Sequence, residues 1–357
     1  MTLASFSRWP IPRQLGLCFA LFFVATATGA ERYSATTVEE AGVTLIVLRD
    51  EVAGMEAAIA PRQGGELSSL RIHFRGEWLE LLYRARDYRE ATGWRGKAPL
   101  LWPAVGRNFS RTQPRDPNAE LCSYDFAGRR YDLPIHGFAR MQAWQVIGTR
   151  ANADGAAVEV ELTDNAATRR QYPFGFSFRI VYRLAEGRLT LTHRIAAARE
   201  NDATMFFSIG NHVTFRLPLV PGSAPGETTL QTPSRFELPK DANTLPAGES
   251  RPLDLSKPSR LAERSFLPPL GLAGYEGDPW VRLADPTGLA IVVTHQAERL
   301  PAGQCILFNL WGSPASGYFS PEPWVGLTDS LNRRAGLIEL QPGEQWAWRI
   351  DFAVEGR

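Results

Sequence analysis

The sequence predicts an all-β protein, built as one large antiparallel β-sandwich. Several segments alternate apolar and polar residues with a period of two, which is typical of strands with one buried face. No long segment carries the apolar stripe of a helix, in which residues recur at i, i+3, i+4 and i+7. The 31 glycines and 26 prolines supply the turns that many short strands need.

The strand predictions follow the chain. In each alternating segment every second side chain is apolar, as Phe176, Phe178 and Ile180 are in the third of them. These segments lie at residues 70–74, 158–162, 176–184, 189–195 and 346–352. The uninterrupted apolar run at 290–293 predicts a strand that is covered on both faces.

One stretch, from Leu217 to Ser256, is rich in proline and polar residues and shows no strand pattern. It is interpreted as a long loop between strands, placed as a flap over a site, or alternatively as a domain linker. The loop is preferred because neither flank is complete as a domain. Residues 31–357 are therefore expected to form a single β-sandwich domain.

The N-terminus is predicted to be a secretory signal peptide, residues 1–30. Arg8 and Arg13 precede an apolar run from Leu15 to Val24, and small residues then offer cleavage after Ala27 or Ala30. The run is short for a membrane span, although an uncleaved anchor is the alternative. The mature protein is therefore expected to be secreted or periplasmic, with no membrane contact after cleavage.

Composition excludes one class of partner. The 39 lysines and arginines nearly balance the 38 acidic residues, so no basic field exists to attract nucleic acid. Two cysteines remain after cleavage, Cys122 and Cys305. An oxidising compartment permits a disulfide between them, but two unpaired thiols fit the sequence equally well.

Two of the five histidines have surroundings that suit chemistry. His136 is followed by Gly137, which allows close approach of a ligand, and His212 follows a strand-like run that ends in Gly210-Asn211. Histidine suits proton transfer near neutral pH, although either residue taken alone could be structural. The histidine spacing matches no metal motif, and no phosphate-binding glycine loop is present, so neither a metal nor a cofactor is predicted.

Glu322 is the carboxylate that stands out, because it lies between two prolines and beside Trp324. The prolines restrict the backbone, and neighbouring rings would raise the pKa of the carboxyl group towards that of a useful base. The alternative is a solvated loop glutamate. Trp324 offers an apolar face for a sugar ring, and Arg107 with Asn108 offers hydrogen-bond partners for sugar hydroxyls, although both also fit ordinary structural roles.

Together these segments resemble the aldose 1-epimerase (galactose mutarotase) family, especially its glucose-6-phosphate 1-epimerase-like branch. The resemblance covers nearly all of residues 31–357. The matching segments, in family order, are Gly64–Leu70, Trp102–Asn108, His136–Arg140, Tyr172–Phe174, Ser208–His212, Glu322–Trp324 and Pro342–Glu344.

The resemblance implies the galactose mutarotase-like supersandwich and a cofactor-free exchange of the α and β anomers of a sugar. A free hexose is the expected partner, because the sequence shows no basic cluster for a sugar phosphate beyond Arg107 and a secreted protein would seldom meet one. It implies that Glu322 is the general base and His212 the general acid, while His136 and Arg107 hold the substrate. Two features depart from the family pattern. Val213 stands where a proline is usual, and the acidic substrate ligand could be Asp254, Glu263 or Asp278.

Two other functions remain open at this point. A non-catalytic carbohydrate-binding protein could use the same fold, because fold does not fix function. A sugar hydrolase or lyase is the second alternative. A hydrolase normally needs two carboxylates that flank the bond, and the sequence offers only Glu322 in a well-defined setting.

Overall fold

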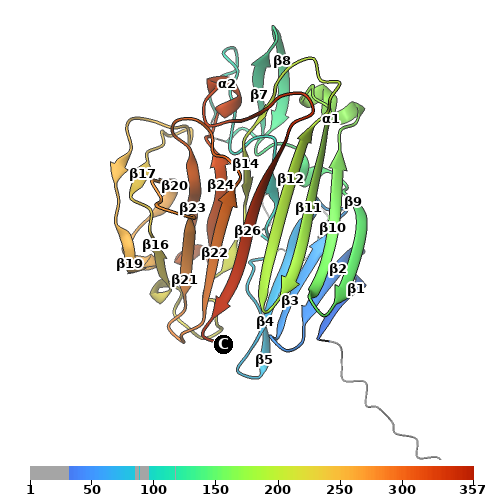
Figure 1. Ribbon diagram of the computed structural model, residues 1–357. Coiled ribbons are helices and arrows are strands. Elements are labelled where there is room, and N and C mark those ends of the chain that lie inside the picture. Colours follow the sequence, from blue (N-terminus) through green and yellow to red (C-terminus); the bar gives the residue numbers. More distant parts are fainter. Residues whose placement is uncertain (1–31, 85–87, 89–95, 117) are drawn as a thin grey trace, which may run out of the picture. The chain divides into compact units, whose positions relative to one another are not determined.

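The computed structural model describes residues 32–84, 88, 96–116 and 118–357, and within it Arg32–Arg357 forms one compact unit. The predicted signal peptide, residues 1–30, lies outside the described residues. The regular elements of the described chain are mostly strands in antiparallel sheets, so the predicted all-β class is confirmed (Figure 1). Within these ranges no helix is long and apolar enough to cross a membrane.

Three sheets carry most of the strands. The five-stranded sheet has the order β1 (Tyr33–Glu40), β2 (Val43–Asp50), β3 (Met55–Ala60), β4 (Glu66–Phe74), β5 (Glu77–Glu80). The nine-stranded sheet has the order β19 (Leu255–Arg260), β16 (Thr229–Thr232), β21 (Trp280–Ala284), β22 (Ala290–Ala297), β26 (Gln345–Glu355), β12 (Arg188–Ala197), β11 (Phe176–Ala185), β10 (Gly155–Thr163), β9 (Gln145–Asn152). The eight-stranded sheet has the order β18 (Arg251–Pro252), β17 (Phe236–Leu238), β20 (Phe266–Ala273), β23 (Ile306–Ser313), β24 (Tyr318–Gly326), β14 (Ile209–Asn211), β6 (Leu100–Leu101), with β15 (Phe215–Arg216) paired to β24.

Shorter elements complete the described chain. Two strand pairs stand apart, β7 (Leu121–Phe126) with β8 (Arg129–Pro134) and β13 (Met205–Phe207) with β25 (Ile338–Leu340). The helical turns are α1 (Ala166–Gln171), α2 (Ser330–Arg333), η1 (Ala139–Met141), η2 (Pro225–Glu227), η3 (Leu261–Glu263) and η4 (Pro314–Ser316). Helix α1 begins where the Asn165 side chain accepts hydrogen bonds from two backbone N–H groups, as an N-cap does.

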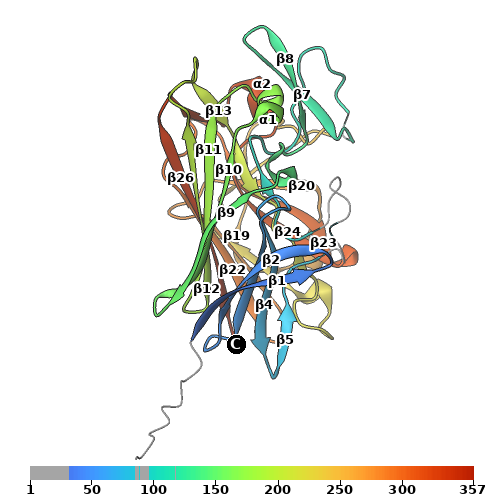
Figure 2. The same ribbon diagram turned by 90° about the vertical axis from the view of Figure 1, so that its right-hand side faces the viewer.

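The nine-stranded sheet forms one layer, and the five- and eight-stranded sheets face it from the other side (Figure 2). Their inner faces share one continuous core that includes Leu48, Phe178 and Phe319, all fully buried. Burial of each such side chain stabilises the fold by roughly 1.5–3 kcal/mol relative to exposure. The alternating apolar residues of the sequence are the ones that face this core. In β11, for example, the apolar residues at every second position are buried.

The stretch from Leu217 to Ser256 differs from the predicted loop. It contains three short strands, β16 to β18, which pair near the edges of the nine- and eight-stranded sheets. Each strand is too short for an alternating sequence pattern to be recognised. Its middle part nevertheless borders the cavity described below.

Cys122 and Cys305 are free thiols, and both are buried.

Candidate functional site

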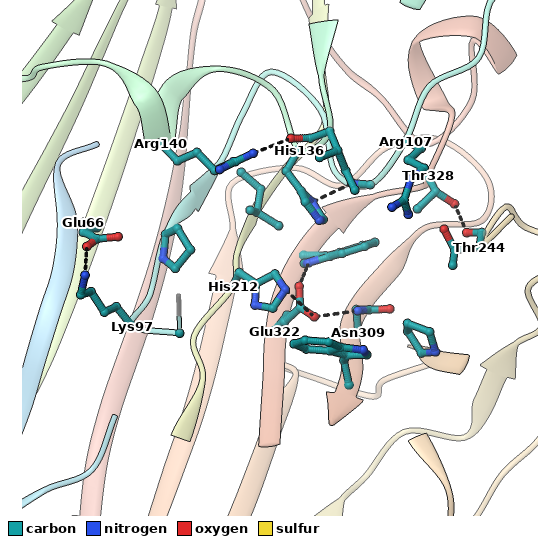
Figure 3. Close-up of a pocket in the computed structure, with 18 of the residues that line it drawn as sticks. Glu66, Lys97, Arg107, His136, Arg140, His212, Thr244, Asn309, Glu322 and Thr328 are labelled. Carbon is teal, nitrogen blue, oxygen red and sulfur yellow. Dashed lines mark hydrogen bonds and ion pairs between the residues drawn. The ribbon is translucent and has the colours of Figure 1, made fainter. Parts of the chain in front are cut away.

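A cavity of about 380 Å³ brings together most of the predicted site residues (Figure 3). Ligand sites typically have volumes of about 300–1,000 Å³, so a single sugar ring fits. Strands β23 and β24 line one part of the cavity, and segments around Arg107, His136 and His212 line another. Lys240 and Thr244 border it from the stretch that was predicted as a loop.

Glu322 lies within strand β24 and is 1% exposed, so it is not a loop residue. Asn309 is its cross-strand partner on β23 and donates from Nδ2 to Oε1 of Glu322 over 2.8 Å. Trp324 Nε1 donates to Oε2 over 3.1 Å. Burial raises the pKa of this carboxyl group, although Asn309, the Lys240 ammonium and Trp324 oppose the rise. Glu322 is therefore fixed by two donors in a site where it can hold a proton near neutral pH.

His212 follows β14 and turns its ring towards Glu322. Its Nε2 lies 3.7 Å from Oε1 of Glu322, and its Nδ1 lies 3.4 Å from the Thr214 hydroxyl. Burial lowers the pKa of His212 to about 4. Val213, which replaces the usual proline, is fully buried, and the His212 backbone N–H donates to Pro99 O over 2.9 Å. The histidine loop is thus anchored without the proline.

His136 is held in a defined tautomer by the backbone. Its Nδ1 lies 3.0 Å from the N–H of Gly106 and accepts that hydrogen bond, so the ring hydrogen is on Nε2. Burial, together with the nearby His212, Arg140 and Arg107, keeps the pKa of His136 well below its ordinary value. The ring centroids of His136 and His212 are 5.7 Å apart. His136 is therefore a neutral hydrogen-bond donor within the cavity.

Gly137 lets the segment that holds His136 pack closely against the backbone of Trp102. His136 and Gly137 have φ angles of 64° and 72°, in the left-handed region. A Cβ at Gly137 would collide with the backbone of Trp102, whose own N–H donates to the His136 carbonyl over 3.1 Å. This close pairing sets where the His136 ring points.

Arg107 and Trp324, both expected to bind substrate, line the cavity, but the Trp324 indole contacts Glu322. The indole is 2% exposed and donates to Glu322, so it orients the carboxylate rather than offering an open face. Trp311 also lines the cavity, with its ring 5.4 Å from that of His212. The Arg107 guanidinium is oriented by a hydrogen bond from Nε to Ala119 O over 3.0 Å.

Asn108 does not line the cavity and is corrected to a structural position. It is 1% exposed, and its Oδ1 accepts a hydrogen bond from the N–H of Leu331 in α2 over 3.0 Å. The two neighbouring side chains, Arg107 and Asn108, point to different sides of the segment, which spacing alone could not reveal. The three proposed acidic ligands are exposed and away from the cavity, namely Asp254, Glu263 and Asp278.

Several cavity residues were not singled out in the sequence. Glu66 and Lys97 form an ion pair, with Oε1 and Nζ 3.6 Å apart, and Glu120 is a third lining carboxylate. Asn309 lies beside Glu322 through the strand register, and Lys240 reaches the pair from the segment after β17 by donating to Asn309. The two cavity lysines could have been singled out from the sequence, because the chain has only three lysines.

The described part of the chain contains no group of three or more His, Cys, Asp or Glu side chains placed to hold a metal ion. The groups that meet at the centre of the cavity are a carboxyl, two imidazoles and an amide. These groups can accept, donate and transfer protons.

The chain is similar in sequence and fold to several known proteins. The sequence model of the family described as aldose 1-epimerase matches residues 44–353. The chromosomal protein LacX of Lactococcus lactis subsp. lactis is 27% identical over 291 residues, which cover 78% of this chain and 87% of LacX. The solved structure of the Slr1438 protein from Synechocystis sp. PCC 6803 has a TM-score of 0.66 at 26% identity, covering 91% of this chain and 96% of that one. A galactose mutarotase related enzyme from Lactobacillus acidophilus shares the fold, with a TM-score of 0.69 at 21% identity, over 90% of this chain and 98% of its own.

Proposed function

The chain belongs to the aldose 1-epimerase family, and on that premise we propose that it interconverts the α and β anomers of a free hexose. Glu322 is the general base and His212 the general acid. The single observation that carries the proposal is the 3.7 Å separation between His212 Nε2 and Glu322 Oε1 inside a sugar-sized cavity.

Anomer exchange requires two proton transfers close together. The base removes the proton of the C1 hydroxyl while the acid protonates the ring oxygen, and the ring opens to the aldehyde. Rotation about the C1–C2 bond followed by closure gives the other anomer. Both oxygens are bonded to the same carbon, so base and acid must be near neighbours, as Glu322 and His212 are.

The pair is suited to holding one proton. Burial favours the neutral forms of both groups, a protonated Glu322 and an uncharged His212. Moving that one proton to His212 gives the carboxylate and imidazolium that begin ring opening. After ring opening Glu322 carries the proton again, and closure reverses the transfers. The proton count of the pair is the same at the start and at the end, so no cofactor is needed.

Other residues hold the sugar in this proposal. Neutral His136 donates from Nε2, and Arg107, which also lines the cavity, offers its guanidinium (Figure 3). A free hexose is favoured over a sugar phosphate because both lysines of the cavity already have partners. Lys97 is paired with Glu66, and Lys240 donates to Asn309.

Location is also a proposal. Residues 1–30 have the layout of a secretory signal peptide, so the mature enzyme is proposed to act on sugars outside the cytoplasm. N-terminal sequencing of the mature protein from its native host tests this, and an intact Met1 would contradict it.

The test of the proposed activity is polarimetry on freshly dissolved α-glucose, α-galactose and α-glucose 6-phosphate. The protein is expected to speed the approach to the anomeric equilibrium of at least one free hexose. Glu322→Gln is expected to lose about 10²–10⁴-fold of that rate, the usual contribution of a positioned proton transfer, while sugar binding by calorimetry persists.

Two outcomes would replace the proposal. Sugar binding without acceleration by the wild-type protein would indicate a carbohydrate-binding protein. Release of reducing ends from an oligosaccharide, lost in Glu322→Gln, would indicate a hydrolase instead.

A further inference from the structure

Lysine is rare in this chain, and its positions are informative. Of the 39 lysines and arginines, three are lysines, which leaves 36 arginines. Lys257 is exposed on β19, whereas Lys97 and Lys240 both line the cavity. A lysine carries a compact charge on a flexible stem, which the planar guanidinium of arginine does not reproduce.

Lys240 touches both groups that hold Glu322. Its Nζ donates a hydrogen bond to Oδ1 of Asn309, and it lies 5.0 Å from the ring centroid of Trp324. Asn309 and Trp324 in turn donate to the two carboxylate oxygens of Glu322. One cation therefore acts on both donors of one carboxylate.

The contact also fixes which way the Asn309 amide points. An ammonium group has three donors and no acceptor, so Asn309 must turn its Oδ1 towards Lys240. The NH2 group is then the end that faces Glu322, as the 2.8 Å hydrogen bond shows. Without the ammonium, the amide could turn over and present its oxygen to the carboxylate.

We propose that Lys240 is a positioning residue that orients Asn309 and stabilises the ionised form of Glu322. The proposal rests on the proposed function, since an ionised Glu322 is the form that accepts the sugar proton. Burial lowers the pKa of the Lys240 ammonium, and the Glu322 carboxylate opposes that shift. Each charge therefore stabilises the other in a buried site that would otherwise favour the neutral form of both groups.

The other groups around Glu322 do not replace this charge. His136 is held neutral by burial, and His212 is neutral until it takes the proton that Glu322 gives up. Arg140 and Arg107 also line the cavity, but their hydrogen bonds go to the backbone oxygens of Ile135 and Ala119.

The test compares Lys240→Met with wild type and with Lys257→Met, the matched exposed control. The active Glu322–His212 pair carries one proton, so activity against pH is bell-shaped. Removing the neighbouring positive charge raises both apparent pKa values of the pair. We expect Lys240→Met to lower kcat and to move the bell to higher pH by about 1–3 units, with KM changed less than about twofold. Lys257→Met keeps the wild-type profile, and Lys240→Arg restores its position.

An unshifted bell in Lys240→Met would overturn the proposal. A raised KM at unchanged kcat would also overturn it and would make Lys240 a substrate ligand. If Lys240→Met fails to fold, judged by circular dichroism, Lys240→Gln makes the same comparison, because it keeps a donor to Asn309 but has no charge.

A second readout separates this proposal from the activity itself. Carbon-13 NMR of glutamate-labelled protein, with Glu322→Gln to assign the signal, follows the Glu322 carboxyl directly. The apparent pKa of this group is expected to rise in Lys240→Met. If wild type shows no mutarotation, the proposed function fails while this titration still decides the role of Lys240. An unchanged titration in an active enzyme rejects Lys240 alone.

Discussion

At the scale of the residue, burial sets the chemistry of the site. Glu322 is 1% exposed, and burial raises the pKa of its carboxyl group. The same environment lowers the pKa of His212 to about 4. The two shifts move in opposite directions around neutral pH, which is how a site separates an acid from a base. The pair therefore keeps one proton over a wide range of pH.

This gives a predicted pH profile for the wild-type enzyme. Below about pH 4 a second proton binds, His212 and Glu322 are both protonated, and no base remains. At alkaline pH the last proton leaves the pair, and no acid remains. We expect kcat/KM to be flat through pH 5–6 and to fall on either side of a broad plateau, as followed by polarimetry in non-interacting buffers. An acidic limb at about pH 6.5, the ordinary histidine value, would contradict this assignment.

At the scale of the element, the sequence pattern revealed strands with clean alternation and missed strands whose pattern is interrupted. Strands β11 and β12 have enough alternating positions for the period of two to be visible. Strand β24 was missed because Pro321 and Pro323 interrupt its pattern, although both pair in register with β23. The same limit on what the sequence pattern reveals applies to the site residues. Glu322 and His212 were recognisable by residue type and local context, but Asn309 reaches Glu322 only through the strand register.

One turn offers a test of how elements position the site. Gly137→Ala would place a Cβ against the Trp102 backbone and displace the segment that holds His136. Gly128→Ala, at a similar φ of 74° in the turn between β7 and β8, meets no atom within 4 Å. We expect Gly128→Ala to lower the free energy of unfolding by about 1–2 kcal/mol, the cost of the left-handed backbone, with kcat/KM unchanged.

Gly137→Ala is expected to lower the free energy of unfolding further and to reduce kcat/KM. Urea unfolding and polarimetry measure the two effects. Equal losses of stability in the two variants, with activity retained in both, would show that the close approach at Gly137 does not position the site.

At the scale of the whole molecule, a buried carboxylate joins two sheets. Asp50 ends β2 and is fully buried, and its oxygens accept from Arg32 Nε at 3.1 Å, from Ala53 N at 3.1 Å and from Gly187 N at 3.0 Å. Gly187 lies in the turn between β11 and β12 of the nine-stranded sheet. Arg357 strengthens this junction by donating to the carbonyls of Ala53 and Gly187.

The junction predicts how stability depends on pH. Burial raises the pKa of Asp50, but the hydrogen bonds from Arg32, Ala53 and Gly187 outweigh it and leave the pKa below its ordinary value. A lowered pKa in the folded state contributes stability above the unfolded value, about 3.9, and that contribution is lost as the pH falls through the folded value. Asp50→Asn, which turns an NH2 group against these donors, is expected to lose about 1–3 kcal/mol at pH 7.

The matched control is Asp132→Asn, an exposed aspartate on β8 whose change is expected to stay within about 0.5 kcal/mol. Urea unfolding at pH 7 and at pH 3 measures both variants. The difference between wild type and Asp50→Asn is expected to shrink at the lower pH, and a difference that grows there would contradict the account.

Exchange NMR on a sugar already at equilibrium tests whether Glu322 and His212 together interconvert its anomers. With a hexose labelled at C1, the wild-type protein is expected to give exchange cross-peaks between the α and β anomeric signals. Glu322→Gln, folded and still binding the sugar, is expected to give none on the same timescale. Wild-type cross-peaks that persist in Glu322→Gln, or no cross-peaks from wild type with any common hexose, would contradict the account.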